Sequence, residues 1–168
     1  MAEPDVLHRT DLAAPGGRRL EPSGVFHLRG AAYTVTFENP AGLATFVELY
    51  LAEADDSKVA RLHLTPRGTG LPAANLRFQL SRAHRVAAAV LIAMDADGRS
   101  HSWMTRDEAG VANVVLAHDS WHPVETALPP ESFITTAELR TVLAQWAFGE
   151  TLPPPAVRWA SVRDVGWF

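Results

Sequence analysis

The chain contains no cysteine. This absence excludes disulfide bonds, thiolate zinc sites, iron–sulfur clusters and cysteine nucleophiles within the sequence. A phosphate-binding loop is missing as well, because Gly68-Thr69-Gly70 precedes an alternating strand pattern and not the helix that phosphate binding requires. We therefore expect that the protein holds no cofactor and that it is a binding protein and not an enzyme.

Long apolar segments are also absent. The longest uninterrupted apolar run is nine residues, 86–94, whereas a membrane-spanning helix needs about 20. The first residues lack the basic and then apolar pattern of a secretory signal. Basic charge is scarce, since 15 Lys and Arg face 19 Asp and Glu, a net charge of −4. We expect a cytoplasmic protein that binds neither membranes nor nucleic acid, because phosphate contact normally requires a basic face.

The length of 168 residues fits one domain with a sizeable core. Residues 1–24 contain several Pro and Gly and few large apolar groups, which predicts a flexible N-terminal arm. Residues 25–168 are expected to form a single domain, because no linker or internal repeat divides them.

Hydrophobic periodicity predicts an α+β fold, an antiparallel meander sheet of about six to seven strands with two main helices packed against it. Alternating or β-branched runs predict strands at 25–29, 33–37, 59–64, 76–80, 85–94, 100–105, 111–118 and 156–162, with a short edge strand at 122–128.

Both predicted helices have clear end signals. Asn39 and Pro40 are the N-cap and first-turn residues of a helix that continues to about residue 54. Thr135 and Glu138 form the capping box of the second helix. Gly149 stands where a glycine commonly ends a helix.

Residues 118–122, His-Asp-Ser-Trp-His, are the segment most suggestive of catalysis. Two histidines four residues apart bind a metal when a helix places them on one face, but Pro123 and the strand-like residues before His118 favour a polar turn. A small hydrolase or metal-dependent enzyme would use His101, Asp119 and His122, and these side chains would have to converge. A non-catalytic scaffold module is a third possibility.

The C-terminal third has a distinctive order of residues. The capped helix is followed by Gly149 and then by Pro154-Pro155-Ala156-Val157-Arg158-Trp159, a Pro-x-x-aliphatic-x-Trp strand. This ending resembles that of bacterial immunity proteins of the Imm1 type, and the order of elements over residues 33–162 is similar. The family usually has Gly-x-Arg-Pro at this point, whereas here two extra residues separate Gly149 from Pro154 and Pro153 replaces the Arg.

Members of that family are encoded beside polymorphic toxins, including nucleic-acid deaminases, and neutralise them. The resemblance implies an inhibitor that binds a cognate toxin domain and occludes its active site. Loops with aromatic and acidic side chains are the expected contacts, because such residues act as anchors and as a rim against a basic partner. The candidates are Asp95, Asp97, Trp103, Arg106, Asp107, Glu108, Trp121 and His122.

Overall fold

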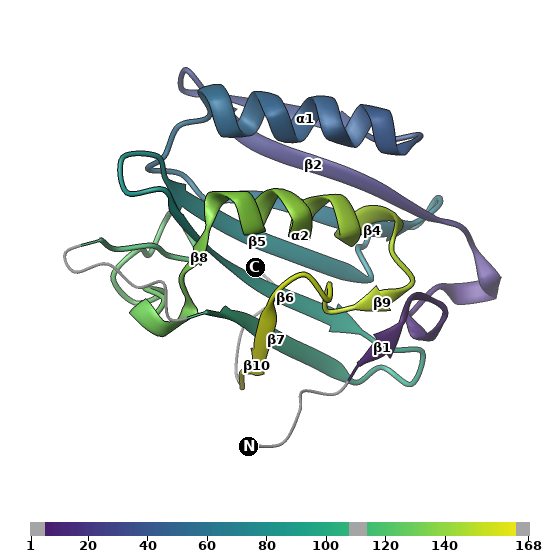
Figure 1. Cartoon of the computed structure of the whole chain (residues 1–168). Helices are drawn as coiled ribbons and strands as arrows, with labels where there is room; N and C mark the ends of the chain where they lie inside the picture. Colours follow the sequence, from purple (N-terminus) through teal and green to yellow (C-terminus); the bar gives the residue numbers. More distant parts are fainter. Residues whose placement is uncertain (1–5, 108–113, 164–168) are drawn as a thin grey trace.

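The computed structural model describes residues 6–107 and 114–163, and both helices lie on one face of an antiparallel sheet (Figure 1). The expected α+β class is confirmed. The helices are α1 (Pro40–Glu53) and α2 (Thr136–Phe148). The strands are β1 (Leu7–His8), β2 (Leu20–Leu28), β3 (Ala31–Thr36), β4 (Ala60–Pro66), β5 (Ala74–Ser81), β6 (Val86–Met94), β7 (Ser100–Arg106), β8 (Ile134–Thr135), β9 (Thr151–Leu152) and β10 (Arg158–Ser161).

The main sheet has the strand order β10-β7-β6-β5-β4-β2-β3, and β8 pairs with β6 beside this path. All of these pairs are antiparallel. Strands β4 to β7 form a meander joined by short turns. Helix α1 carries the chain from β3 to β4, which pairs with β2. Strand β3 is therefore one edge of the sheet, and β10 is the other.

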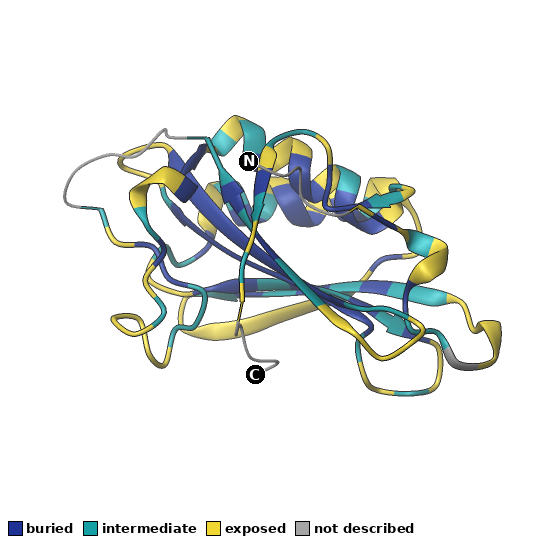
Figure 2. Ribbon diagram, turned by 90° about the horizontal axis from the view of Figure 1, so that it is seen from below, coloured by how far each residue is buried: buried dark blue, intermediate teal, exposed yellow. Residues whose placement is uncertain are grey.

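The main core lies between the helices and the sheet, where the buried residues gather (Figure 2). Helix α1 contributes Phe46 and Tyr50, and α2 contributes Leu143 and Trp146, all at most 1% exposed. The predicted helix starts are confirmed, since the Asn39 side chain accepts the Gly42 amide at 3.0 Å and Thr135 accepts the Glu138 amide at 3.1 Å. Neither helix has the length and apolar character that crossing a membrane requires, within the part of the chain described.

Gly149 ends α2 for a reason that differs from the usual one. Its backbone is extended, with φ −74°, and not left-handed. A Cβ at this position would lie 2.3 Å from the Gln145 carbonyl oxygen. Close approach to the preceding turn therefore requires glycine here.

The strands expected at 111–118 and 122–128 are wrong for the residues described. Residues 114–128 form a loop with one isolated bridge, between Ala117 and Ala127, while 111–113 lie outside the described residues. Leu116 and Leu128 instead pack on the sheet face opposite the helices. The expected place for another strand, the outer edge of β7, is taken by β10.

Residues 6–24 are packed against the domain, in place of the loose arm expected over 1–24. Strand β1 pairs with β9, and the few large apolar residues of this segment include Leu7 and Leu12, both buried. The Arg9 guanidinium donates to the Ala147 carbonyl at the end of α2. Strand β2 begins at Leu20, five residues before the predicted start.

Candidate protein-binding site

Trp121 is the most exposed large hydrophobic residue described, at 87%. Val124 is 83% exposed and Val115 68%, so three of the four most exposed large hydrophobic residues lie in one segment. Exposed apolar groups that cluster in this way are typical of interaction sites. We call residues 115–126 the Trp121 loop.

The Trp121 loop is fixed to the sheet by buried and half-buried hydrogen bonds. The Gln79 side chain of β5 accepts the Ala117 amide at 2.7 Å and donates to the Asp56 carbonyl at 2.9 Å. The Ser120 hydroxyl accepts the Val59 amide at 2.6 Å. These bonds join the loop to β5 and to the start of β4.

A second set of bonds shapes the loop itself. Asp119 accepts the Trp121 amide through Oδ1 at 3.0 Å, and its Oδ2 lies 3.0 Å from Nδ1 of His122. The Thr126 hydroxyl accepts the Asp119 amide at 3.2 Å and donates to the His122 carbonyl at 2.7 Å. The indole of Trp121 therefore projects into solvent from a backbone that is already ordered.

The contact between Asp119 and His122 shifts the pKa of both side chains. The hydrogen bond from His122, together with the Trp121 amide, lowers the pKa of Asp119. The same hydrogen bond raises the pKa of His122 above its ordinary value of 6.5. The pair is thus an ion pair in weakly acidic solution.

Beneath the loop, the sheet carries basic side chains. Arg77 is fully buried, lies opposite Arg61 across the β4–β5 pair, and its Nη1 is 3.4 Å from Nδ1 of His118. Burial and the nearby Arg61 lower the pKa of Arg77 to about 10. Burial and Arg77 also lower the pKa of His118, which favours its neutral form. The Asp119 carboxylate acts to raise the pKa of Arg77, so the loop helps to stabilise the charged form of this buried guanidinium.

Several of the predicted contact residues have structural roles. Trp103 is 1% exposed and belongs to the core, so its prediction as a contact is wrong. It lies on β7 with its side chain toward the helices, a burial that alternation alone does not reveal. Asp95 is mostly buried in the β6–β7 turn and accepts the Asp97 and Arg99 amides at 2.9 Å. Asp97 is exposed in that turn, and Glu108 lies outside the described residues.

Four of the predicted contact residues fall at opposite ends of β6. Arg106 ends β7 and Asp107 follows it, both half-buried, at the end where β6 begins, which is also the end that carries the Trp121 loop. Asp107 lies beside the N-terminus of α2, where burial and its hydrogen bond raise the pKa of Glu138. Asp95 and Asp97 lie at the other end.

The structure does not bring His101, Asp119 and His122 together. Nε2 of His101 lies 2.9 Å from Oδ2 of Asp95, and its ring stacks on Trp103 at a centroid distance of 5.9 Å. This places His101 on the helix side of the sheet, whereas Asp119 and His122 pair on a loop over the other side. Within 6–107 and 114–163, no group of three or more His, Asp and Glu is arranged to hold a metal ion.

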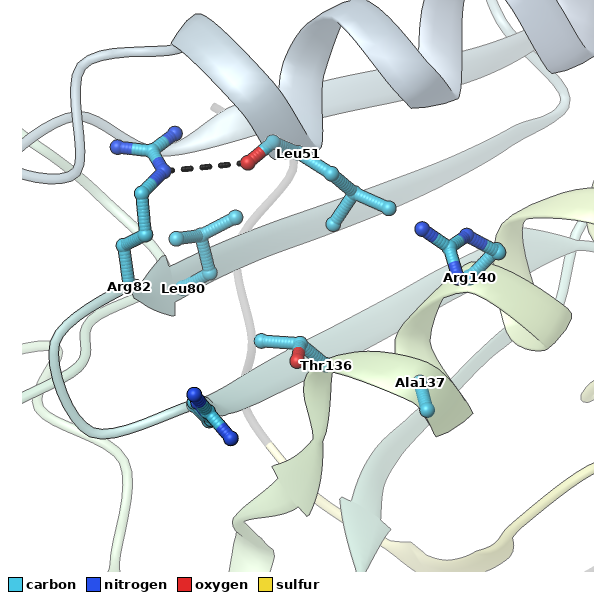
Figure 3. Close-up of a pocket in the computed structure, with 7 residues that line it drawn as sticks. Leu51, Leu80, Arg82, Thr136, Ala137 and Arg140 are labelled. Carbon is cyan, nitrogen blue, oxygen red and sulfur yellow. Dashed lines mark hydrogen bonds between the residues drawn. The ribbon is translucent and has the colours of Figure 1, made fainter.

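A groove between the end of α1 and the start of α2 contains three arginines (Figure 3). Arg82 donates to the Leu51 carbonyl at 3.1 Å and to the Ala54 carbonyl at 3.0 Å, and pairs with Asp56. Arg140 pairs with Glu48 on α1 at 2.9 Å. Arg82 therefore satisfies carbonyl groups at the C-terminal end of α1, and Arg140 links α2 to α1. Both side chains have structural roles in this groove.

The sequence identified Trp121 and His122 and a polar turn at Asp119 and Ser120, but not Gln79 or Thr126. Gln79 and Ser120 act through contacts with distant segments, which no local pattern specifies, whereas Thr126 bonds within the loop itself. A signal was available for Val124, because a large apolar residue in a polar turn after Pro123 has no local core to enter.

Comparison with protein-family models, with curated proteins and with solved structures finds no match to this chain.

Proposed function

We propose that this protein is a cytoplasmic immunity-type inhibitor, which binds a toxin domain through the Trp121 loop and covers the active site of that toxin. The observation that carries the proposal is the 87% exposure of Trp121 on a loop whose backbone is held at Asp119, Ser120 and Thr126. The resemblance of the C-terminal third to immunity proteins supplies the kind of partner.

The energetics favour a role for Trp121 as an anchor. A tryptophan side chain buries about 150–250 Å², which at about 25 cal/mol/Å² corresponds to roughly 4–6 kcal/mol. Part of this gain is normally lost when an interface must be ordered on binding. Asp119 and Thr126 already order the loop in the free protein, so that cost is smaller here.

The neighbouring residues suit the edge of such an interface. Val124 and Val115 are two further exposed apolar side chains of the same loop. His122 is exposed and carries charge in weakly acidic solution, so it adds a polar contact at the rim. A hydrophobic centre with a polar rim is the usual anatomy of protein interfaces.

The proposal is tested with the protein encoded by the gene next to that of this chain. Its toxic domain is expressed in bacteria with and without the chain, and the purified pair is mixed for size-exclusion chromatography. We expect restored growth and a one-to-one complex. Failure to restore growth, or growth without a complex, would overturn the proposal of direct binding.

A further inference from the structure

The outer edge of β3 is open among the described residues. Strand β3 pairs with β2 on one side only, and its sequence, Ala-Ala-Tyr-Thr-Val-Thr, has neither charge nor proline. All of its residues are exposed except Val35, which is half-buried. Figure 2 shows an exposed strand of this kind at one edge of the sheet. Natural proteins usually protect such an edge with charges, prolines or bulges, and the continuous register with β2 shows no bulge.

The alternation of hydrogen bonds defines which backbone groups face outward. Leu28 and Ala31 close the two-residue turn between β2 and β3 and are therefore a hydrogen-bonded pair. The Phe37 amide donates to the Pro22 carbonyl at 2.9 Å, which agrees with the same alternation. The N–H and C=O groups of Ala32, Thr34 and Thr36 consequently point away from β2.

The opposite edge of the sheet is protected. Strand β10 has only four residues, begins with the exposed Arg158, and follows the turn that contains Pro153-Pro154-Pro155. A chain with one open edge and one protected edge forms a closed pair and not an extended fibre.

We propose that β3 is a self-association surface, on which a second copy of this chain adds its own β3 in antiparallel orientation about a two-fold axis at Thr34. In this register Ala32 faces Thr36 of the second copy, and each facing pair of outward residues exchanges two hydrogen bonds. Tyr33 then faces Val35 of the second copy on the helix side, an aromatic–β-branched pair that stabilises sheets.

Charge also favours the antiparallel arrangement. Arg29 precedes β3 and Glu38 follows it, so an antiparallel partner places opposite charges near each other at both ends of the joined strands. A parallel partner would place like charges together. The pairing uses a surface outside the Trp121 loop and does not depend on the proposed toxin.

Because the chain has no cysteine, a single introduced thiol reports on the pairing. In a hydrogen-bonded antiparallel pair the Cα atoms are about 5.5 Å apart, within the range that a disulfide spans. We expect Thr34→Cys to form a covalent dimer at least about tenfold faster than the control Thr141→Cys, which is exposed on α2, because pairing raises the local thiol concentration. Equal rates for the two variants would contradict the proposal.

A second measurement uses the unmodified chain. Sedimentation equilibrium of the wild-type protein is expected to show a monomer–dimer equilibrium, which Thr34→Lys shifts to monomer while the circular dichroism spectrum stays unchanged. A wild-type protein that remains monomeric at the highest accessible concentration, or a Thr34→Lys variant that dimerises equally well, would overturn the assignment.

Discussion

One carboxylate oxygen of Asp119 lies 3.0 Å from Nδ1 of His122, and the other accepts the Trp121 amide at 3.0 Å. The Asp119 side chain is only 13% exposed, although it belongs to a loop with an almost fully exposed tryptophan. A single carboxylate therefore orients both of the residues that we expect to meet a partner.

Replacing Asp119 with Asn is expected to lower the pKa of His122 toward its ordinary value of 6.5. The amide keeps the shape of the side chain and can still accept the Trp121 amide, but it removes the negative charge that stabilises the imidazolium. An NMR titration of the histidine ring protons measures this change. His84, which bonds Ser81 and not Asp119, serves as the internal control. An unchanged pKa of His122 would show that the pair does not form in solution.

The same ion pair predicts a pH window for stability. A raised pKa of His122 gives a stabilising contribution that is complete below the unfolded value and lost as pH rises through the folded value. A lowered pKa of Asp119 gives a contribution that is present above the unfolded value and lost as pH falls through the folded value. The difference in unfolding free energy between wild type and Asp119→Asn should therefore be largest at weakly acidic pH. Urea unfolding at several pH values measures this difference. A difference in unfolding free energy that does not vary with pH would contradict the prediction.

Gln79 is expected to hold the Trp121 loop on the sheet. Gln79→Ala leaves the buried Ala117 amide without its acceptor, which costs about 1–3 kcal/mol. Urea denaturation measures this loss, and hydrogen exchange should show faster exchange at Ala117 than the global change explains. If Ala117 exchanges only in proportion to global stability, Gln79 has no local anchoring role.

Two glycines should respond to alanine in opposite directions. Gly149→Ala is expected to destabilise the protein by about 1–3 kcal/mol, because its Cβ would overlap the Gln145 carbonyl. Gly42→Ala in the first turn of α1 would place its Cβ at an ordinary contact distance, 3.8 Å, from Oδ1 of Asn39, and should stabilise the protein by up to about 1 kcal/mol. Thermal melts of both variants provide the comparison, and equal effects would be inconsistent with the tight turn at Gly149.

The fold was largely predictable, because its main elements depend on local signals. The caps at Asn39 and Thr135 and the alternation along β4 and β5 are properties of a few neighbouring residues. The covering loop at 114–128 was not predictable, since Leu116 and Leu128 carry the apolar character of a strand but satisfy it against the outer face of β6. Its conformation depends on bonds to Gln79 and Val59, which lie far away in the sequence.

The candidate site was predicted only in part for the same reason. Trp103 and Trp121 are equivalent in a composition table, yet one is 1% exposed and the other 87%. Which face of a strand is covered, and which loop is anchored to it, are decided by packing between distant segments. The N-terminal residues show the same effect, since Leu7 and Leu12 find their partners only in the assembled domain.

The most direct test of the proposed function is the affinity of the chain for the toxin domain that we propose is encoded beside it, measured by isothermal titration calorimetry with Trp121→Ala and with the control Leu71→Ala. Leu71 is 75% exposed in another loop, so its replacement removes a similar exposed apolar group away from the Trp121 loop. We expect Trp121→Ala to weaken binding by about 2–4 kcal/mol, roughly 30- to 1,000-fold in Kd, while Leu71→Ala and wild type bind alike. Equal affinities for Trp121→Ala and wild type would contradict the account.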